Sequence, residues 1–213
     1  MSNIISFVGL EREDIPYYIA QAIAEKNKNV LVIDNSMSHN LFLSFHRIDE
    51  DDDSVESGRI LYLRNKNYSE KTFEKFDVVI VFMGLNPVQD LIDISEKVVF
   101  VTSYMPSDIR IITKYINTES LYEQYKDKMS ILFVEKPSNK VSEKFIESFY
   151  EFKTFEDEFV LSFDETDFAM RQNFQINGSQ QWKGVSSEMK DYIKLYTAMF
   201  DTAKKAAKKG VTE

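Results

Sequence analysis

The stretch Val8-Gly9-Leu10-Glu11-Arg12-Glu13-Asp14-Ile15-Pro16 joins an apolar run, Ile4–Val8, to an amphipathic segment. The run predicts a buried strand and the segment predicts a helix, so residues 9–14 form a strand-to-helix turn. In an α/β nucleotide-binding protein, such a turn holds phosphate groups with glycines, a lysine and a hydroxyl residue, in the pattern G-x-x-x-x-G-K-S/T. This turn has one glycine, no lysine, no Ser or Thr, and three carboxylates. The turn has the position of a nucleotide site, but its residues disfavour a polyanion.

Short apolar runs recur along the chain and alternate with helical patterns. The runs are Ile4–Val8, Val30–Ile33, Arg59–Leu63, Val78–Phe82, Val98–Val101, Ile131–Val134 and Phe159–Phe163. Runs without polar alternation are typical of parallel strands that are buried on both faces. The pattern predicts a single α/β domain over residues 1–213. We expect a doubly wound, mostly parallel sheet of about seven strands, with helices on both faces.

Two helices are indicated by apolar stripes. The first follows the quoted turn; Asp14 is expected as its N-cap, and Asn27 is expected to adopt the left-handed conformation after its end. Its apolar face is Ile15, Ile19, Ala22 and Ile23. The last helix is expected from Ser187 to Lys209, with a stripe of Tyr192, Leu195, Tyr196, Met199 and Ala203.

Composition narrows the function classes. The net charge of −9 opposes broad nucleic-acid binding, which depends on a surplus of Lys and Arg. The chain has no cysteine and only two histidines, His39 and His46, which disfavours thiol chemistry and histidine-based metal sites. The acidic run Asp49–Asp53 is interpreted as a solvated loop, because a calcium loop needs glycine at its sixth position and Ser54 stands there. Neither a signal peptide nor a membrane-spanning run is evident, so we expect a cytoplasmic protein.

The order of segments resembles the ParA/MinD family of P-loop ATPases. Ala20–Asp34 is similar to the family's first helix and second strand, and Phe76–Val81 to the strand that carries its metal-linked aspartate. Lys97–Arg110 resembles the next strand, loop and helix start. Further matches are Met129–Glu135 with Lys140–Ser142, and Phe159–Asn173, which resembles the final strand and the loop after it. The resemblance implies a three-layer, P-loop NTPase-like fold.

The departures from the family pattern all fall at its nucleotide site. Arg12 stands where the family has its phosphate-binding lysine, and Glu13 stands where it has a hydroxyl ligand for magnesium. The family's Asp-x-Asp becomes Asp34-Asn35-Ser36, and its Asp-x-x-Gly switch becomes Phe82-Met83-Gly84-Leu85, with no carboxylate. Carboxylates near a triphosphate repel it by about 1 kcal/mol per unit-charge pair at 4 Å in water, and by more at a lower dielectric. We therefore expect neither binding nor hydrolysis of ATP-Mg, and no other cofactor or metal.

Several residues carry two interpretations. The degenerate pocket would lie near Gly9, Arg12, Asp14, Asp34 and Ser36. Asp34 is either a functional acid at a strand end or an acid that anchors a loop or caps a helix, and the second interpretation is favoured. Arg12 could bind an anion, but we expect an exposed ion pair with Glu11, Glu13 or a neighbouring acid. Trp182 is expected to pack against the final helix, with a partner contact as the alternative.

The resemblance leads to a hypothesis of function. Degenerate family members are similar to accessory proteins that position pilus or secretion machinery, so we expect a non-catalytic assembly, localisation or scaffold factor. We expect it to contact a protein partner or form a homodimer, with Met83–Pro87 as an apolar contact surface. The C-terminal helix either packs on the sheet or makes a weak peripheral membrane contact. The alternatives are an ATPase with a site rebuilt from Arg12 and Asp34, and a DNA partition protein, which the net charge of −9 disfavours.

Overall fold

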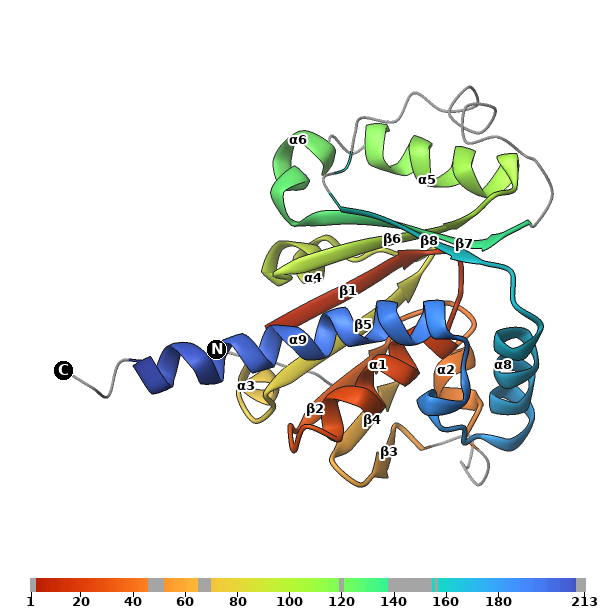
Figure 1. Cartoon of the computed structure of the whole chain (residues 1–213). Coiled ribbons are helices and arrows are strands. Elements are labelled where there is room, and N and C mark those ends of the chain that lie inside the picture. The colour runs from red at the N-terminus through yellow and green to blue at the C-terminus, as the bar shows by residue number, and fades with distance from the viewer. Residues whose placement is uncertain are drawn as a thin grey trace.

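A computed structural model describes residues 3–45, 52–64, 70–118, 121–137, 155 and 157–209, with residues 70, 118, 121, 122 and 200–209 described by their backbone alone. Its strands are β1 (Asn3–Gly9), β2 (Val30–Asp34), β3 (Ser54–Ser57), β4 (Ile60–Arg64), β5 (Val78–Gly84), β6 (Lys97–Ser103), β7 (Met129–Lys136) and β8 (Asp157–Ser162). They form one sheet in the order β3-β4-β2-β5-β1-β6-β7-β8 (Figure 1). Every neighbouring pair is parallel except β3 and β4.

The expected α/β sheet is confirmed, with one strand more than the sequence indicated. Each of the seven apolar runs overlaps one strand, with only Arg59 and Phe163 lying just outside β4 and β8. The additional strand, β3, pairs antiparallel with β4 at the edge of the sheet. Its sequence is Ser-Val-Glu-Ser, and only Val55 is partly buried. An exposed edge strand needs no apolar run, so the hydrophobic pattern could not reveal it.

Helices cover both faces of the sheet. They are α1 (Asp14–Ala24), α2 (Asn40–Leu43), α3 (Glu70–Phe73), α4 (Gln89–Ile94), α5 (Pro106–Thr118), α6 (Leu121–Tyr125), α8 (Glu165–Asn177) and α9 (Ser187–Lys209), with 3-10 turns η1 (Lys126–Lys128) and η2 (Trp182–Gly184). In Figure 1, α1 and α9 lie on one side of the sheet, and α5 lies on the other. Neighbouring β1 residues divide accordingly, because Ile5 packs in the core cluster with α1 and α9, and Ile4 packs in the cluster with α4 and α5. The three-layer architecture follows from this alternation.

The first helix is confirmed except for its cap. The four residues of its apolar face are buried, and Asn27 has φ +60°. The prediction of Asp14 as the N-cap is wrong: Glu13 holds the N-cap position without a capping side-chain bond, and Asp14 is the first helical residue. The physical reason is a competing partner, because the Asp14 carboxylate bonds to Arg12.

The last helix has the expected bounds, and Tyr192 and Tyr196 of the expected stripe are buried, but Leu195 and Met199 are not. Its core side chains are Met189, Tyr192, Ile193 and Tyr196, whereas Leu195 and Met199 are 46% and 40% exposed. The helix packs on α1 and β8, so this part of it supports the sheet. The side chains of Ala203 and of the lysines at 204, 205, 208 and 209 lie outside those described.

Other expectations fall partly on residues that are not described. Residues 49–51 of the acidic run, His46, and Lys140–Ser142 lie outside the described ranges. Trp182 is partly buried against the cluster that contains α1 and α9, and its backbone N–H donates to Gln21 of α1 at 3.0 Å. Within the described residues, no helix is both long and apolar enough to cross a bilayer.

Candidate functional site

The turn after β1 is built on a glycine that no other residue could replace without strain. Gly9 has φ +120°, and a Cβ on it would lie 2.2 Å from the carbonyl oxygen of Val101 in β6. The next residue, Leu10, donates its backbone N–H to the same oxygen at 2.8 Å. The chain therefore passes directly against β6 before it enters α1, and this close approach fixes where residues 11–14 lie.

Arg12 is buried and points into the protein. The side chain is 5% exposed, and its Nε and Nη2 donate to the two carboxylate oxygens of Asp14 at 2.9 and 2.8 Å. Nη1 donates to Oε1 of Glu135 at 3.3 Å. Burial is the largest single effect and lowers the pKa of Arg12, but the charge and hydrogen bonds of Asp14, with the charges of Glu135 and Glu13, together outweigh it and the net shift is upward. Arg12 therefore pairs with a neighbouring acid, which was one of the expected partners, but the expectation of an exposed pair is wrong, since the two-pronged geometry of guanidinium and carboxylate is satisfied inside the fold by Asp14.

Glu13 is held by two residues of α8. The Glu13 side chain is completely buried, and its carboxylate accepts hydrogen bonds from Nε and Nη2 of Arg171, both at 3.3 Å. The Gln175 amide donates to the same carboxylate, and Arg171 also donates to the backbone oxygen of Glu11 at 2.9 Å. Arg171 and Gln175 are four residues apart, so they share one face of α8. Thus α8 closes over the turn that follows β1.

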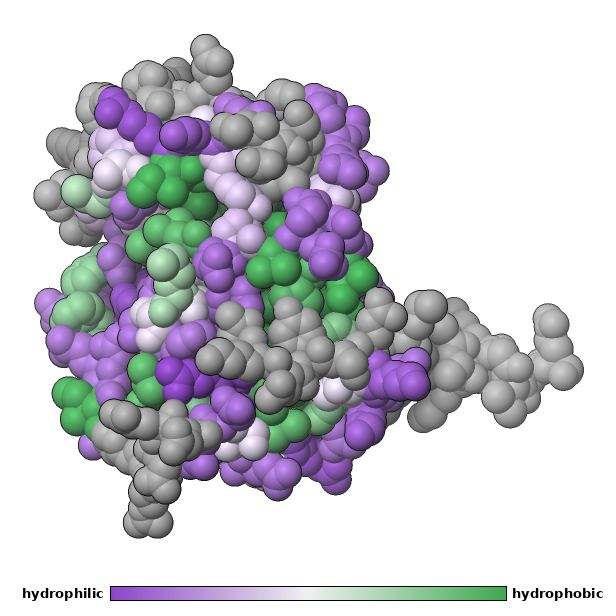
Figure 2. Space-filling view, turned by 180° about the vertical axis from the view of Figure 1, so that it is seen from behind, coloured by the Kyte–Doolittle hydropathy of each residue, from purple (hydrophilic) through white to green (hydrophobic). Residues whose placement is uncertain are grey.

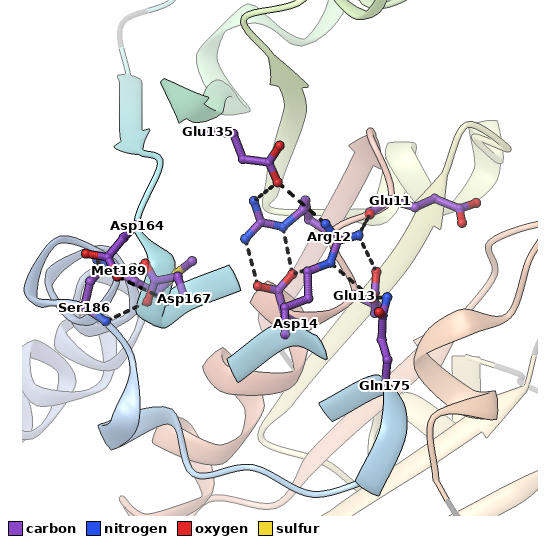
Figure 3. Close-up of polar contacts among 11 residues, drawn as sticks. Glu11, Arg12, Glu13, Asp14, Glu135, Asp164, Asp167, Gln175, Ser186 and Met189 are labelled. Carbon is purple, nitrogen blue, oxygen red and sulfur yellow. Dashed lines mark hydrogen bonds and ion pairs between the residues drawn. The ribbon is translucent and has the colours of Figure 1, made fainter. Parts of the chain in front are cut away.

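Glu135 completes the network from the end of β7. It has φ +59°, an uncommon conformation for a residue with a side chain, and the register between β7 and β8 shifts between Phe133 and Lys136. Its Oε1 lies 3.3 Å from Nη1 of Arg12 and 3.7 Å from Nη1 of Arg171. Left-handed backbone costs about 1 kcal/mol for such a residue. Figure 3 shows Glu135, Arg12 and Asp14 converging above the start of α1.

The network leaves an excess of negative charge at the turn. Within the described residues, Arg12 and Arg171 face the carboxylates of Glu13, Asp14 and Glu135. Burial raises the pKa of Asp14. The charge and hydrogen bonds of Arg12, and then the charge of Arg171, have the opposite effect and together outweigh burial, so the net shift is downward. Both guanidinium groups therefore already have carboxylate partners from the protein itself.

Asp34 anchors the loop that follows β2. Its Oδ1 accepts from the backbone N–H and the hydroxyl of Ser36 at 3.1 and 2.6 Å, and its Oδ2 accepts from the N–H of Phe42 at 2.9 Å. Burial raises the pKa of Asp34, although the bonds from Ser36 and Phe42 oppose that effect. All three bonds come from its own loop and from α2, which is the loop-anchoring arrangement that the sequence favoured.

Glu11 lies beside Gly84 at the end of β5. Gly84 has φ +54°, and a Cβ on it would lie 2.9 Å from Oε1 of Glu11 and 3.2 Å from Cβ of Ser36. The other oxygen of Glu11 accepts from the hydroxyl of Ser38. The structure thus separates the predicted site residues into two adjoining clusters. Arg12 and Asp14 lie with α8 and β7, whereas Asp34 and Ser36 lie with Glu11 and Gly84.

A pocket opens beside the first cluster. It is a small, open pocket, and its charged lining residues are Arg12, Glu135, Asp164, Asp167 and Arg171. Asp164 accepts from the N–H groups of Thr166 and Asp167 at 2.8 and 3.2 Å and so caps α8. Asp167 accepts from the N–H and the hydroxyl of Ser186, both at 2.6 Å. The sequence resemblance took the segment up to Asn173 for a loop, and therefore missed α8 and the site residues that it carries. The Asp164 cap followed by Glu165 in the first turn was the available signal.

Solved structures place this fold among ParA and MinD ATPases. A ParA family ATPase from Chlorobium tepidum has 12% identity and a TM-score of 0.66, with 90% of this chain and 96% of that chain covered. Cyanothece McdA, in a complex with ATP, has 8% identity and a TM-score of 0.63, with coverages of 92% and 96%. MinD in the MinC:MinD cell division complex of Aquifex aeolicus has 14% identity and a TM-score of 0.57, with coverages of 82% and 86%.

These comparisons establish the fold class, a P-loop NTPase-like α/β domain. No protein-family model matches the sequence, and no curated protein is significantly similar to it. At such low identities the likeness speaks for the fold alone, and function has to be argued from the site.

Proposed function

We propose that this chain is a ParA/MinD-like protein that does not use ATP and that acts through protein contacts, as an assembly, localisation or scaffold factor. The ion-paired turn after β1 carries the proposal. Glu13 and Asp14 are both fully buried at the start of α1, where a P-loop protein presents backbone N–H groups to phosphate. The Asp14 carboxylate forms an ion pair with Arg12, and the Glu13 carboxylate forms one with Arg171.

A nucleotide would have to break this network to bind. A phosphate approaching Arg12 competes with the bidentate carboxylate of Asp14 and with Glu135, which also accepts from Arg12. Leaving Asp14 buried and unpaired would cost several kcal/mol. Asp34 and Arg12, the residues from which a rebuilt ATPase site would be made, already have partners in their own loops. These contacts favour the scaffold over the rebuilt ATPase.

The carboxyl edge of the sheet offers a surface for a protein partner. Met37, Leu85 and Met105 follow β2, β5 and β6 and are 78%, 51% and 62% exposed. The carboxyl ends of parallel strands meet at one edge, so these side chains share it. On the face turned away in Figure 1, hydrophobic residues occur in patches separated by hydrophilic ones (Figure 2). Exposed apolar side chains concentrated at one edge support a contact with a partner or with a second copy.

Thermal unfolding with nucleotide tests the proposal. A ligand at about 100 times its Kd adds about 2.7 kcal/mol of stability, which for a chain of this size is a rise in Tm of about 5–10 °C. We expect no rise with ATP or ADP and magnesium beyond that given by magnesium with sodium sulfate. A saturable rise with ATP that Arg12→Ala abolishes would refute the proposal and show that the site binds nucleotide. Light scattering of the nucleotide-free chain distinguishes a constitutive dimer from a monomer that needs another partner.

A further inference from the structure

The pocket beside the ion-paired turn combines an apolar wall with acidic groups. The wall is formed by Leu161, Phe163, Phe168 and Met189. Phe163 and Phe168 are 49% and 47% exposed, and their ring centroids lie 6.1 Å apart. Two half-exposed phenyl rings side by side at the mouth of a pocket are ready to cover an apolar or cationic group.

The charges of this pocket select against an anion. Its lining contains three carboxylates and two guanidinium groups. Both guanidinium groups pair with Glu13 and Asp14 behind the pocket, and both also lie near Glu135, so that two cations are shared among these three carboxylates, and Asp164 and Asp167 add further negative charge. Glu135 keeps 42% of its side chain exposed, and hydrogen bonds from backbone N–H groups lower the pKa of Asp164. The charge that remains for a ligand is therefore negative.

We propose that this pocket binds a lysine or arginine side chain presented by a protein partner, with its methylene stem against Phe163 and Phe168 and its charged end toward Glu135 and Asp164. Such a side chain is apolar along its stem and cationic at its tip, as the pocket requires. The phenyl rings bury the methylene stem, and the carboxylates accept hydrogen bonds from the N–H groups of the charged end. The inference rests on the proposed function, because it specifies the chemistry of the partner that a scaffold of this kind would hold.

Methyl NMR of the full chain tests the proposal. With ¹³C-methyl methionine, Met189 reports on the pocket, and Met199, which is 40% exposed further along α9 and does not line the pocket, is the control reporter. The probes are Nα-acetyl-lysine amide, Nα-acetyl-arginine amide, and Nα-acetyl-norleucine amide, which keeps the stem and lacks the charge. We expect saturable shifts of Met189 but not of Met199 with the two cations, at about millimolar Kd for molecules of this size. Norleucine should bind about tenfold more weakly.

Matched variants separate the pocket from general attraction to an acidic protein. Asp164→Asn keeps the helix cap, because Asn caps as well as Asp, and removes the charge. It should weaken lysine binding about threefold, as should Phe168→Ala. Ile176→Ala on the same helix, where Ile176 is 63% exposed, and Glu56→Gln on the distant strand β3 should leave the affinity unchanged.

Three results would overturn the pocket proposal. These are equal binding of norleucine and lysine amides, wild-type affinity in both Asp164→Asn and Phe168→Ala, and tighter binding of Nα-acetyl-glutamate amide. Failure here is distinguishable from failure of the proposed function. A chain that binds neither lysine amide nor ATP refutes only this pocket, whereas a chain that binds ATP refutes the proposed function.

Discussion

Removing one member of the Arg12–Asp14 pair should destabilise the protein far more than removing both. In Arg12→Met, the Asp14 carboxylate stays fully buried, and its nearest remaining cation is Arg171, with Nε at 3.8 Å. Removing one partner of a buried ion pair costs about 3–5 kcal/mol, whereas replacing the whole pair with apolar residues is often close to neutral. We expect Arg12→Met to lower the free energy of unfolding by about 3–5 kcal/mol, which lowers Tm by about 6–20 °C. The double variant Arg12→Met/Asp14→Leu should recover at least about half of that loss.

Urea unfolding of the wild type, the two single variants and the double variant measures this coupling. Lys194→Met serves as the matched control, because Lys194 pairs with Asp191 at 2.9 Å but both side chains are more than half exposed. That variant should change stability by less than about 0.5 kcal/mol. A loss below about 1 kcal/mol in Arg12→Met, or a double variant as unstable as the sum of the singles, would refute the reasoning that the turn is organised by a buried ion pair.

Three further predictions follow from the same contacts. The pKa of Asp14 lies below its ordinary value of 3.8 in the folded protein, so its ion pair stabilises the fold above that pH and the stabilisation disappears as the pH falls through the folded-state pKa. Asp14→Asn should therefore flatten the loss of stability between neutral and acidic pH, as measured by urea unfolding at several pH values. Gly9→Ala should cost more than about 2 kcal/mol because of its contact with Val101, against about 1 kcal/mol for Gly58→Ala, whose φ is +62° but whose surroundings are open. Asp34→Ala leaves the buried N–H groups of Ser36 and Phe42 without their acceptor, at about 1–3 kcal/mol each, and should speed hydrogen exchange at these two amides but not at Leu10.

The sheet could be predicted from the sequence because a strand that is buried on both faces is apolar at successive positions. Val78–Phe82 is apolar at every position, and each of these residues is buried in β5. No such apolar run marks β3, where three of four side chains face solvent. The last helix is an intermediate case. Its bounds were predictable, but choosing the buried face from Tyr192, Leu195 and Tyr196 required knowing where α1 lies.

The contacts of the site depended on information that the sequence pattern does not carry. The unusual composition of residues 11–14 was evident, but the partner of Arg12 was not. Arg12 and Asp14 are two residues apart, and their contact depends on Asp14 lying inside the first turn of α1. Glu135 lies at the site with a left-handed backbone beside a register shift. A glutamate rarely adopts this conformation, so the sequence could not predict it. Arg171 and Gln175 come from a helix that the sequence resemblance did not provide.

The contacts of α8 also have a consequence for how the chain folds. Glu13 and Arg171 are separated by 158 positions in the sequence, and Glu13 and Gln175 by 162. Closing a loop of that length is slow compared with forming α1 or a neighbouring pair of strands. The contacts between this turn and α8 can therefore form only after residues 165–177 have been synthesised. Interactions that form after the rate-limiting step slow unfolding without accelerating folding. We therefore expect Arg171→Met to raise the unfolding rate and to leave the refolding rate almost unchanged. The contacts of α8 with the N-terminal turn would then stabilise the protein kinetically, by slowing unfolding.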